Sequence, residues 1–257
     1  MAINTVTRTD VAAAIRTIAR NHSSNTAAAA RRALSAFFAW AIADGLLGDG
    51  ANPVDGSHRP ADPAPRDHIL TPAELVSVWK ACGEDDYGTI VRLLLLLGSR
   101  RQEVGGIRWD EIDLDAPKER SKNGREHVIA LPPEVRAILS SVPQNGDHLF
   151  GFRNAGFTSW TEGKKALDGR LAGTVRPWRL HDVRRSVATG MADLGVDPHI
   201  IEQCLNHFSG HRRGVAGVYN RSNYERAASA AFARWSAHLI ALVEGREQSK
   251  VVALRRA

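Results

Sequence analysis

The sequence predicts a mainly α protein with a small antiparallel β-sheet. Along most of the chain, apolar residues recur every three to four positions, which is the period of a helix with one buried face. Two short stretches, 109–115 and 126–131, are instead typical of strands on either side of a turn at 122–124. Hydrophobic residues make up 43% and charged residues 24% of the 257 residues, as in a globular protein.

Two helices are expected before residue 52. The first would be capped by Thr9 or Asp10 and has Val11, Ile15 and Ile18 on one face. The second covers about 26–43. It ends at Asp44-Gly45, because glycine adopts the left-handed conformation after a helix without steric cost.

A proline-rich stretch divides the chain. Four of the eleven prolines fall between positions 53 and 65, and a segment of this composition is typical of a linker. The sequence therefore predicts a helical domain over 1–52, a linker over 53–68 and a larger domain over 69–257.

The larger domain is expected to begin with a helix, because Thr71-Pro72-Ala73-Glu74 combines a capping box with proline at the first helical position. A buried helix through 90–97 follows. After the two short strands, the chain returns to helix over 181–194, 198–206 and 223–244. The last helix carries an apolar stripe at 232–243, which would either dock on a neighbouring subunit or pack within its own.

Charge is distributed unevenly along the chain. The net charge is +6, and residues 170–257 carry 14 basic and 7 acidic groups, whereas residues 67–169 carry 13 and 16. Of the 34 basic residues 28 are arginine, whose planar guanidinium suits bidentate contacts with phosphate. A nucleic-acid partner and a plain solubility role explain this balance about equally well.

Several classes of protein are excluded. The longest apolar stretch, 93–97, is far too short for a membrane span of roughly 20 residues, and the first ten residues lack the layout of a signal peptide. The two cysteines lie 122 positions apart and cannot form a disulfide framework, so a reducing, cytoplasmic setting is expected. A P-loop, a Rossmann glycine pattern and a nucleophile elbow are all missing from the sequence.

Three basic clusters are candidates for chemistry, and each has a plainer explanation. The segment 98–103 follows the buried helix, but arginines also gather at helix ends because cations favour the C-terminus. His181 and Arg184 share a helix face and could converge on one phosphate, or they could be a cap and a solvated charge. After 205–207 and a glycine-rich basic loop, Tyr219 is either a nucleophile or a packed aromatic residue.

A metal site is the remaining alternative from the residues alone. Cys204, His207 and His211 are spaced so that they could lie near one another, but a fourth ligand is missing. We therefore expect no metal, and no other cofactor.

Together these clusters make the chain resemble the tyrosine recombinases, and more narrowly the integrases of phages and genomic islands. The resemblance runs from about 69 to 242 and rests on five fragments in order: LLLLLGSRRQEVGGIRWDEIDL, SKNGREHVIALP, RLHDVRRSVATGMADLGV, CLNH and GVAGVYNR. It implies the integrase catalytic domain fold over 69–257, after a partial helical core-binding domain over 1–52. It also implies a site-specific recombinase that cleaves and rejoins DNA through a 3′-phosphotyrosyl intermediate, without metal or ATP.

The resemblance also implies which groups handle the phosphate. Arg100 and Arg184 match the two arginines that clamp the non-bridging oxygens of the scissile phosphate. Glu103 matches a supporting acidic residue near the first of them. Tyr219 matches the nucleophile, and Tyr224, five residues on, is the competing assignment.

Proton transfer is assigned to three further positions by the same resemblance. His181 and His207 match the histidines of the family's His-x-x-Arg and Leu-x-His motifs. Lys122, on the turn between the predicted strands, matches the lysine that protonates the departing 5′ oxygen. A tyrosine hydroxyl with a pKa near 10 needs help to lose its proton, which a nearby histidine could supply.

The implied partner is double-stranded DNA at attachment-type sites in the nucleoid. The protein would bind this DNA as a homotetramer, with DNA-bending proteins as accessory factors.

Two departures from the family pattern keep alternatives open. Only about two helices precede the linker, and the stretch before Lys122, which contains Pro117, is shorter than a full strand. The alternatives are a non-catalytic DNA-binding remnant and, less favoured, a type IB topoisomerase-like enzyme that relaxes DNA.

Overall fold

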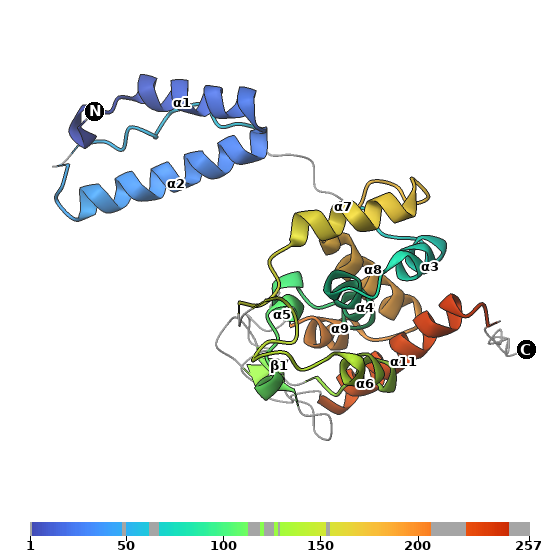
Figure 1. The fold of residues 1–257 in the computed structure, drawn as a ribbon. Coiled ribbons are helices and arrows are strands. Elements are labelled where there is room, and N and C mark those ends of the chain that lie inside the picture. The colour runs from blue at the N-terminus through green and yellow to red at the C-terminus, as the bar shows by residue number, and fades with distance from the viewer. Residues whose placement is uncertain are drawn as a thin grey trace, which may run out of the picture. The chain divides into compact units, whose positions relative to one another are not determined.

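The computed structural model describes residues 2–47, 50–61, 67–112, 119–120, 126–127, 129–152, 155–206 and 225–246 (Figure 1). The chain divides into two compact units, Met1–Asp67 and His68–Ala257, each with its own hydrophobic core. None of the described helices is both long enough and apolar enough to cross a membrane.

The first unit is a pair of helices, α1 (Arg8–Asn21) and α2 (Ser24–Ala43), preceded by the 3-10 turn η1 (Ile3–Thr5). Thr7, rather than Thr9 or Asp10, caps α1: its backbone N–H donates to the Asp10 carboxylate at 2.9 Å, while its hydroxyl accepts from the Asp10 N–H. The small core between the helices is built from five buried residues: Val11, Ile15, Ala27, Phe38 and Val54.

Residues 52–57, most of them at the start of the predicted linker, also pack in the first unit. Asn52 donates its side-chain amide to the carbonyl of Ser35 at 2.9 Å. Arg31 donates to the carbonyl of Val54 and to the hydroxyl of Ser57, both at 3.1 Å. These contacts fold the chain back over α2 and bury Val54 completely.

The second unit is built around α4 (Asp86–Leu97), whose residues Leu93–Leu97 are all buried. Thr71 and Glu74 form the predicted capping box in front of α3 (Pro72–Ala81). Figure 1 shows the other helices arranged about α4. They are α5 (Arg101–Gly105), α6 (Pro133–Ser141), α7 (Trp160–Leu171), α8 (Leu180–Asp193), α9 (Pro198–Cys204) and α11 (Glu225–Val243).

The apolar stripe of α11 packs within its own chain. Phe232, Trp235 and Leu239 are at most 1% exposed and belong to the core of the second unit. The Trp235 indole N–H donates to the carbonyl of Leu95 in α4 at 2.8 Å. Of the two alternatives for this stripe, the structure therefore supports packing within the subunit.

The fold class is corrected to a helical one, because the described residues show no more of the predicted small antiparallel sheet than one ladder of two residues per strand. Residues 109–111, expected in a strand, form the 3-10 turn η2 (Trp109–Glu111). The only ladder described joins β1 (Glu119–Arg120) to β2 (Glu126–His127), two residues each.

Local hydrogen bonds explain why the first stretch turns. Arg108 forms an isolated antiparallel bridge with His148, and the N–H of Trp109 donates to the carbonyl of Asp147. The Glu111 carboxylate accepts from the backbone N–H of Arg108 at 3.1 Å, which closes the turn. A side chain that accepts from a nearby backbone N–H in this way offers the backbone an alternative to the hydrogen bonds of a sheet ladder. Pro117, close before β1, also lacks the N–H that a ladder needs.

Candidate active site

Arg184 lies at the centre of the site, on α8, and is only 6% exposed. Its Nη1 donates to the carbonyl of Gly98 at 2.8 Å, and its Nη2 donates to the carbonyl of Leu205. Gly98 ends α4 and Leu205 ends α9, so the guanidinium is held between two helix C-termini. These ends carry partial negative charge and carbonyls without helical partners, which suits a cation.

Arg100 lies directly before α5 and is held by Glu103. Its Nη1 donates to one oxygen of the Glu103 carboxylate at 2.7 Å, and its backbone N–H donates to the other at 2.8 Å. Its Nη2 donates to the carbonyl of Asn206 at 3.4 Å. The Arg100 side chain is 37% exposed and that of Glu103 is 13% exposed. The carboxylate therefore holds the guanidinium from its more buried side.

The two arginines repel each other electrostatically. Burial, and after it the charge of Arg100, lower the pKa of Arg184 to about 10, while Glu103 acts in the opposite direction. Arg184 therefore remains charged at neutral pH although it is buried and has carbonyls, rather than a carboxylate, as its described partners. An anion bound between the guanidiniums would relieve this repulsion.

His181 lies at the exposed edge of the same site, one turn before Arg184 on α8. Burial, followed by the charges of Arg185, Arg184 and Arg100, lowers the pKa of its imidazole. The histidine is therefore neutral at pH 7, and a neutral imidazole can accept a proton. Of the sequence-predicted residues, the structure thus brings together Arg100, Glu103, His181 and Arg184.

The other predicted site residues lie outside the described part of the chain. They are Lys122, His207, Tyr219 and the competing Tyr224. The chain is described as far as Asn206, whose carbonyl accepts from Arg100, and again from Glu225.

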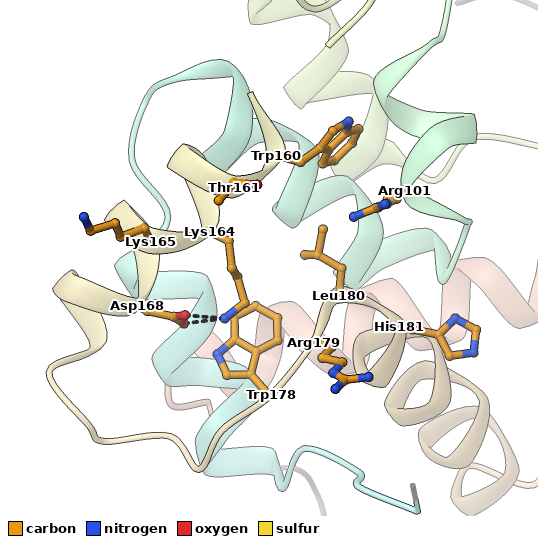
Figure 2. Close-up of a pocket in the computed structure, with 10 residues that line it drawn as sticks. All are labelled: Arg101, Trp160, Thr161, Lys164, Lys165, Asp168, Trp178, Arg179, Leu180 and His181. Carbon is orange, nitrogen blue, oxygen red and sulfur yellow. Dashed lines mark hydrogen bonds and ion pairs between the residues drawn. The ribbon is translucent and has the colours of Figure 1, made fainter. Parts of the chain in front are cut away.

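A basic and aromatic pocket of about 640 Å³ adjoins His181 (Figure 2). It lies between α5, α7 and the start of α8. The Arg101 guanidinium lies over the Trp160 ring at 5.4 Å, and the Lys164 ammonium lies over the Trp178 ring at 4.3 Å. Lys164 is also paired with Asp168 at 2.6 Å.

Sequence reasoning missed this pocket. The signal available was the spacing of Trp160 and Lys164, which are four residues apart and therefore share a helix face, with a second lysine next to Lys164. The approach of Trp178 from the segment before α8 could not be read from the sequence, because it depends on how that segment crosses α7.

Cys204, the described member of the zinc alternative, lies in the core of the second unit. Its thiol is 1% exposed and donates to the carbonyl of Ala228 in α11 at 3.7 Å. Burial raises the pKa of this thiol to about 12. The other two residues of the zinc alternative, His207 and His211, lie outside the described residues. Across the described segments, no three histidine, cysteine or acidic side chains gather as a metal site would require.

Residues 69–226 match the family model described as "Phage integrase family", which covers more than half of the chain. The chain therefore belongs to the phage integrase family. Among curated proteins it is similar to prophage integrase IntA of Escherichia coli (strain K12), with 31% identity over 141 residues, covering 51% of this chain and 33% of that protein. Prophage integrase IntF of the same strain is 27% identical over 126 residues, covering 46% and 27%. The matches thus span a third or less of these relatives' length.

Solved structures with the same fold include three kinds of integrase. A lambda integrase fragment, as a dimer bound to a COC′ core site, matches with a TM-score of 0.60 at 18% identity, covering 80% of this chain and 81% of that one. The Tn1549 transposon integrase in complex with circular intermediate DNA matches with 0.60 at 19%, covering 90% and 85%. The integrase of mycobacterium phage Brujita matches with 0.55 at 17%, covering 93% and 84%.

Proposed function

We propose that this chain is a site-specific DNA recombinase that cleaves and rejoins DNA strands through a covalent link to Tyr219. The observation that carries the proposal is the pair of arginines, one buried and one half-exposed, whose guanidiniums donate to the consecutive carbonyls of Leu205 and Asn206. A phosphodiester is an anion that would fit between them. Family membership supports the same reaction.

In the proposed reaction, Arg100 and Arg184 bind the non-bridging oxygens, where negative charge increases as the tyrosine attacks. Fixed donors that are in place before the reaction stabilise such charge without reorganising. The phenolic oxygen of Tyr219 forms the new bond to phosphorus, and the bond from phosphorus to the 5′ oxygen breaks. One phosphodiester replaces another, so rejoining needs no external energy source.

Protons must leave the tyrosine and reach the departing oxygen. His181, neutral at pH 7 because burial and the arginines lower its pKa, would take the tyrosine proton, with His207 as the second candidate. Lys122 would donate a proton to the 5′ oxygen. Tyr219 and Lys122 carry these roles by their match to the family's motifs.

Double-stranded DNA is the proposed substrate, at attachment-type sites in the nucleoid. Relatives with the same fold have been solved as a dimer on a core site and as a tetramer on a Holliday junction, which supports a homotetramer on DNA. We include DNA-bending proteins as accessory factors. The helical unit before residue 67 would act as part of a core-binding domain. The pocket beside His181 would add contacts to the DNA backbone through Arg101, Lys164 and Lys165.

Covalent trapping tests the proposal. Sheared DNA of the source genome is incubated with the full chain, and adducts that resist SDS are counted for wild type, Tyr219→Phe, Tyr224→Phe and Arg184→Ala. We expect adducts that Tyr219→Phe abolishes and Tyr224→Phe leaves. Arg184→Ala should slow their formation by roughly 10²–10³-fold, as removal of one fixed charge-stabilising donor does elsewhere.

Salt-sensitive DNA binding without any adduct would instead support the non-catalytic remnant. The observation that favours this second candidate is in the sequence: the stretch before Lys122 is shorter than a full strand and contains Pro117. Adducts that Tyr224→Phe alone removes would move the nucleophile to Tyr224.

A further inference from the structure

Directly after α9, Asn206 adopts a left-handed backbone with φ of 47°. Leu205 caps the helix with φ −85° and ψ 0°, and the N–H of Asn206 donates to the carbonyl of Gln203 at 3.0 Å. In the described segments, only Ala172 and Asn206 combine a side chain with a positive φ. Asparagine enters this region more readily than most residues with a Cβ, so the residue type fits the turn.

This turn directs two consecutive carbonyls toward the two arginines. The carbonyl of Leu205 accepts from Arg184, and the carbonyl of Asn206 accepts from Arg100 at 3.4 Å. Carbonyls in the last turn of a helix have no helical partner, so their direction depends on how the chain leaves the helix. One backbone conformation therefore determines a hydrogen-bond partner of each guanidinium.

A second left-handed helix end completes the arrangement. Gly98 ends α4 with φ of 62°, and its carbonyl holds Arg184 from the other side at 2.8 Å. The two helix ends abut: a Cβ built on Gly98 would lie 2.8 Å from Cδ2 of Leu205. Movement of the α9 end would therefore move the buried arginine relative to α4.

We propose that Asn206 is a positioning residue for DNA cleavage, and that it acts through its left-handed backbone rather than through its side-chain amide. By aiming the two carbonyls, it sets the distance and the tilt between the guanidiniums of Arg100 and Arg184. Arginine has five N–H donors, and within the described residues Arg184 uses two of them on the carbonyls, which would leave others for phosphate. The inference rests on the proposed recombinase function.

Three variants of the full chain separate the backbone role from general destabilisation. Asn206→Gly keeps the left-handed turn and removes the amide, whereas Asn206→Val opposes the turn, because a β-branched residue is strained at positive φ. Ala172→Val is the matched control, since Ala172 has φ of 48° and ends α7, whereas Arg100 precedes α5 and Arg184 lies on α8. Thermal unfolding compares the stability loss of the two valine variants.

The rate of SDS-resistant adduct formation on sheared source-genome DNA is the first readout, and DNA affinity is the second. We expect Asn206→Gly to stay within about 2-fold of wild type, and Asn206→Val to lose roughly 10- to 100-fold in rate, as small misplacements of catalytic groups do. Affinity should change far less than rate. Ala172→Val should lose stability without a comparable loss of rate.

Two results would overturn the proposal: an equal loss of rate in Asn206→Gly and Asn206→Val, or an equal loss in Ala172→Val. A third readout is independent of activity. NMR of the arginine side-chain N–H groups should show guanidinium rotation restricted in wild type and Asn206→Gly, and freed in Asn206→Val. If wild type forms no adduct, the proposed function fails, and the NMR comparison alone decides whether Asn206 positions the arginines.

Discussion

At the scale of single residues, the pKa of His181 depends on the positive charges around it. Burial and then Arg185, Arg184 and Arg100 lower its pKa, so near pH 6 the unfolded chain binds more protons here than the folded chain. The contribution of His181 to the free energy of unfolding is therefore complete above the ordinary histidine pKa, and it is lost as the pH falls below that value. Arg185→Gln removes one of these charges, and we expect the pKa of His181 to rise in an NMR titration of its imidazole.

Arg176→Gln serves as the control, because the Arg176 side chain is 66% exposed and is paired with Glu74 on α3. This variant should leave the His181 titration unchanged. A pKa of His181 that stays constant or falls in Arg185→Gln would contradict the account.

The residue scale also shows what the sequence could and could not reveal. His181 and Arg184 were predicted on one face of a helix, because a spacing of three is local. The burial of Arg184 was not predicted. Its two carbonyl partners lie 86 and 21 positions away, and pairings over such distances follow from the packing of α4, α8 and α9.

At the scale of elements, the contact of α8 with α11 depends on a glycine. A Cβ on Gly190 would lie 2.2 Å from the Trp235 ring, which is itself fixed by its hydrogen bond to Leu95. Gly190→Ala should therefore lower the free energy of unfolding by about 1–3 kcal/mol, despite the better helix propensity of alanine. Denaturant titration measures the effect.

A second helical glycine gives the matched control. Gly169 lies in α7, and a Cβ built there meets nothing within 4 Å. Gly169→Ala should raise the free energy of unfolding by up to about 1 kcal/mol, because only the propensity gain remains. Two variants that change stability in the same direction would refute the packing argument.

Elements with a strong local signal were predicted, and those without one were not. The Thr71 capping box begins α3 as expected, and the buried run 90–97 lies in α4. Helix α7 was missed because its sequence holds two glycines and buries only Leu167 and Leu171, which leaves a weak apolar period. The strand expected at 109–115 is not formed over its described residues, 109–112, since side-chain capping at Arg108 and Glu111 forms a turn there instead.

At the scale of the whole molecule, the division of the chain follows from two separate cores. The proline-rich composition pointed to a boundary, yet the contacts of Arg31 and Asn52 place 52–57 in the first unit. Composition marks where a chain is free of regular structure, but a segment without helix or strand can still bury a side chain such as Val54.

Because the cores are separate, a cavity in the first should leave the second intact. Phe38 is 3% exposed and is the largest of the buried residues in the first core, so Phe38→Ala should cost about 3–5 kcal/mol there. Hydrogen exchange read by mass spectrometry should show α1 and α2 losing protection while α4 and α8 keep theirs. If the first unit contributes phosphate contacts, the same variant should weaken binding to duplex DNA and flatten its dependence on salt. Loss of protection in both units together would mean that they fold as one, and would refute the independence of the cores.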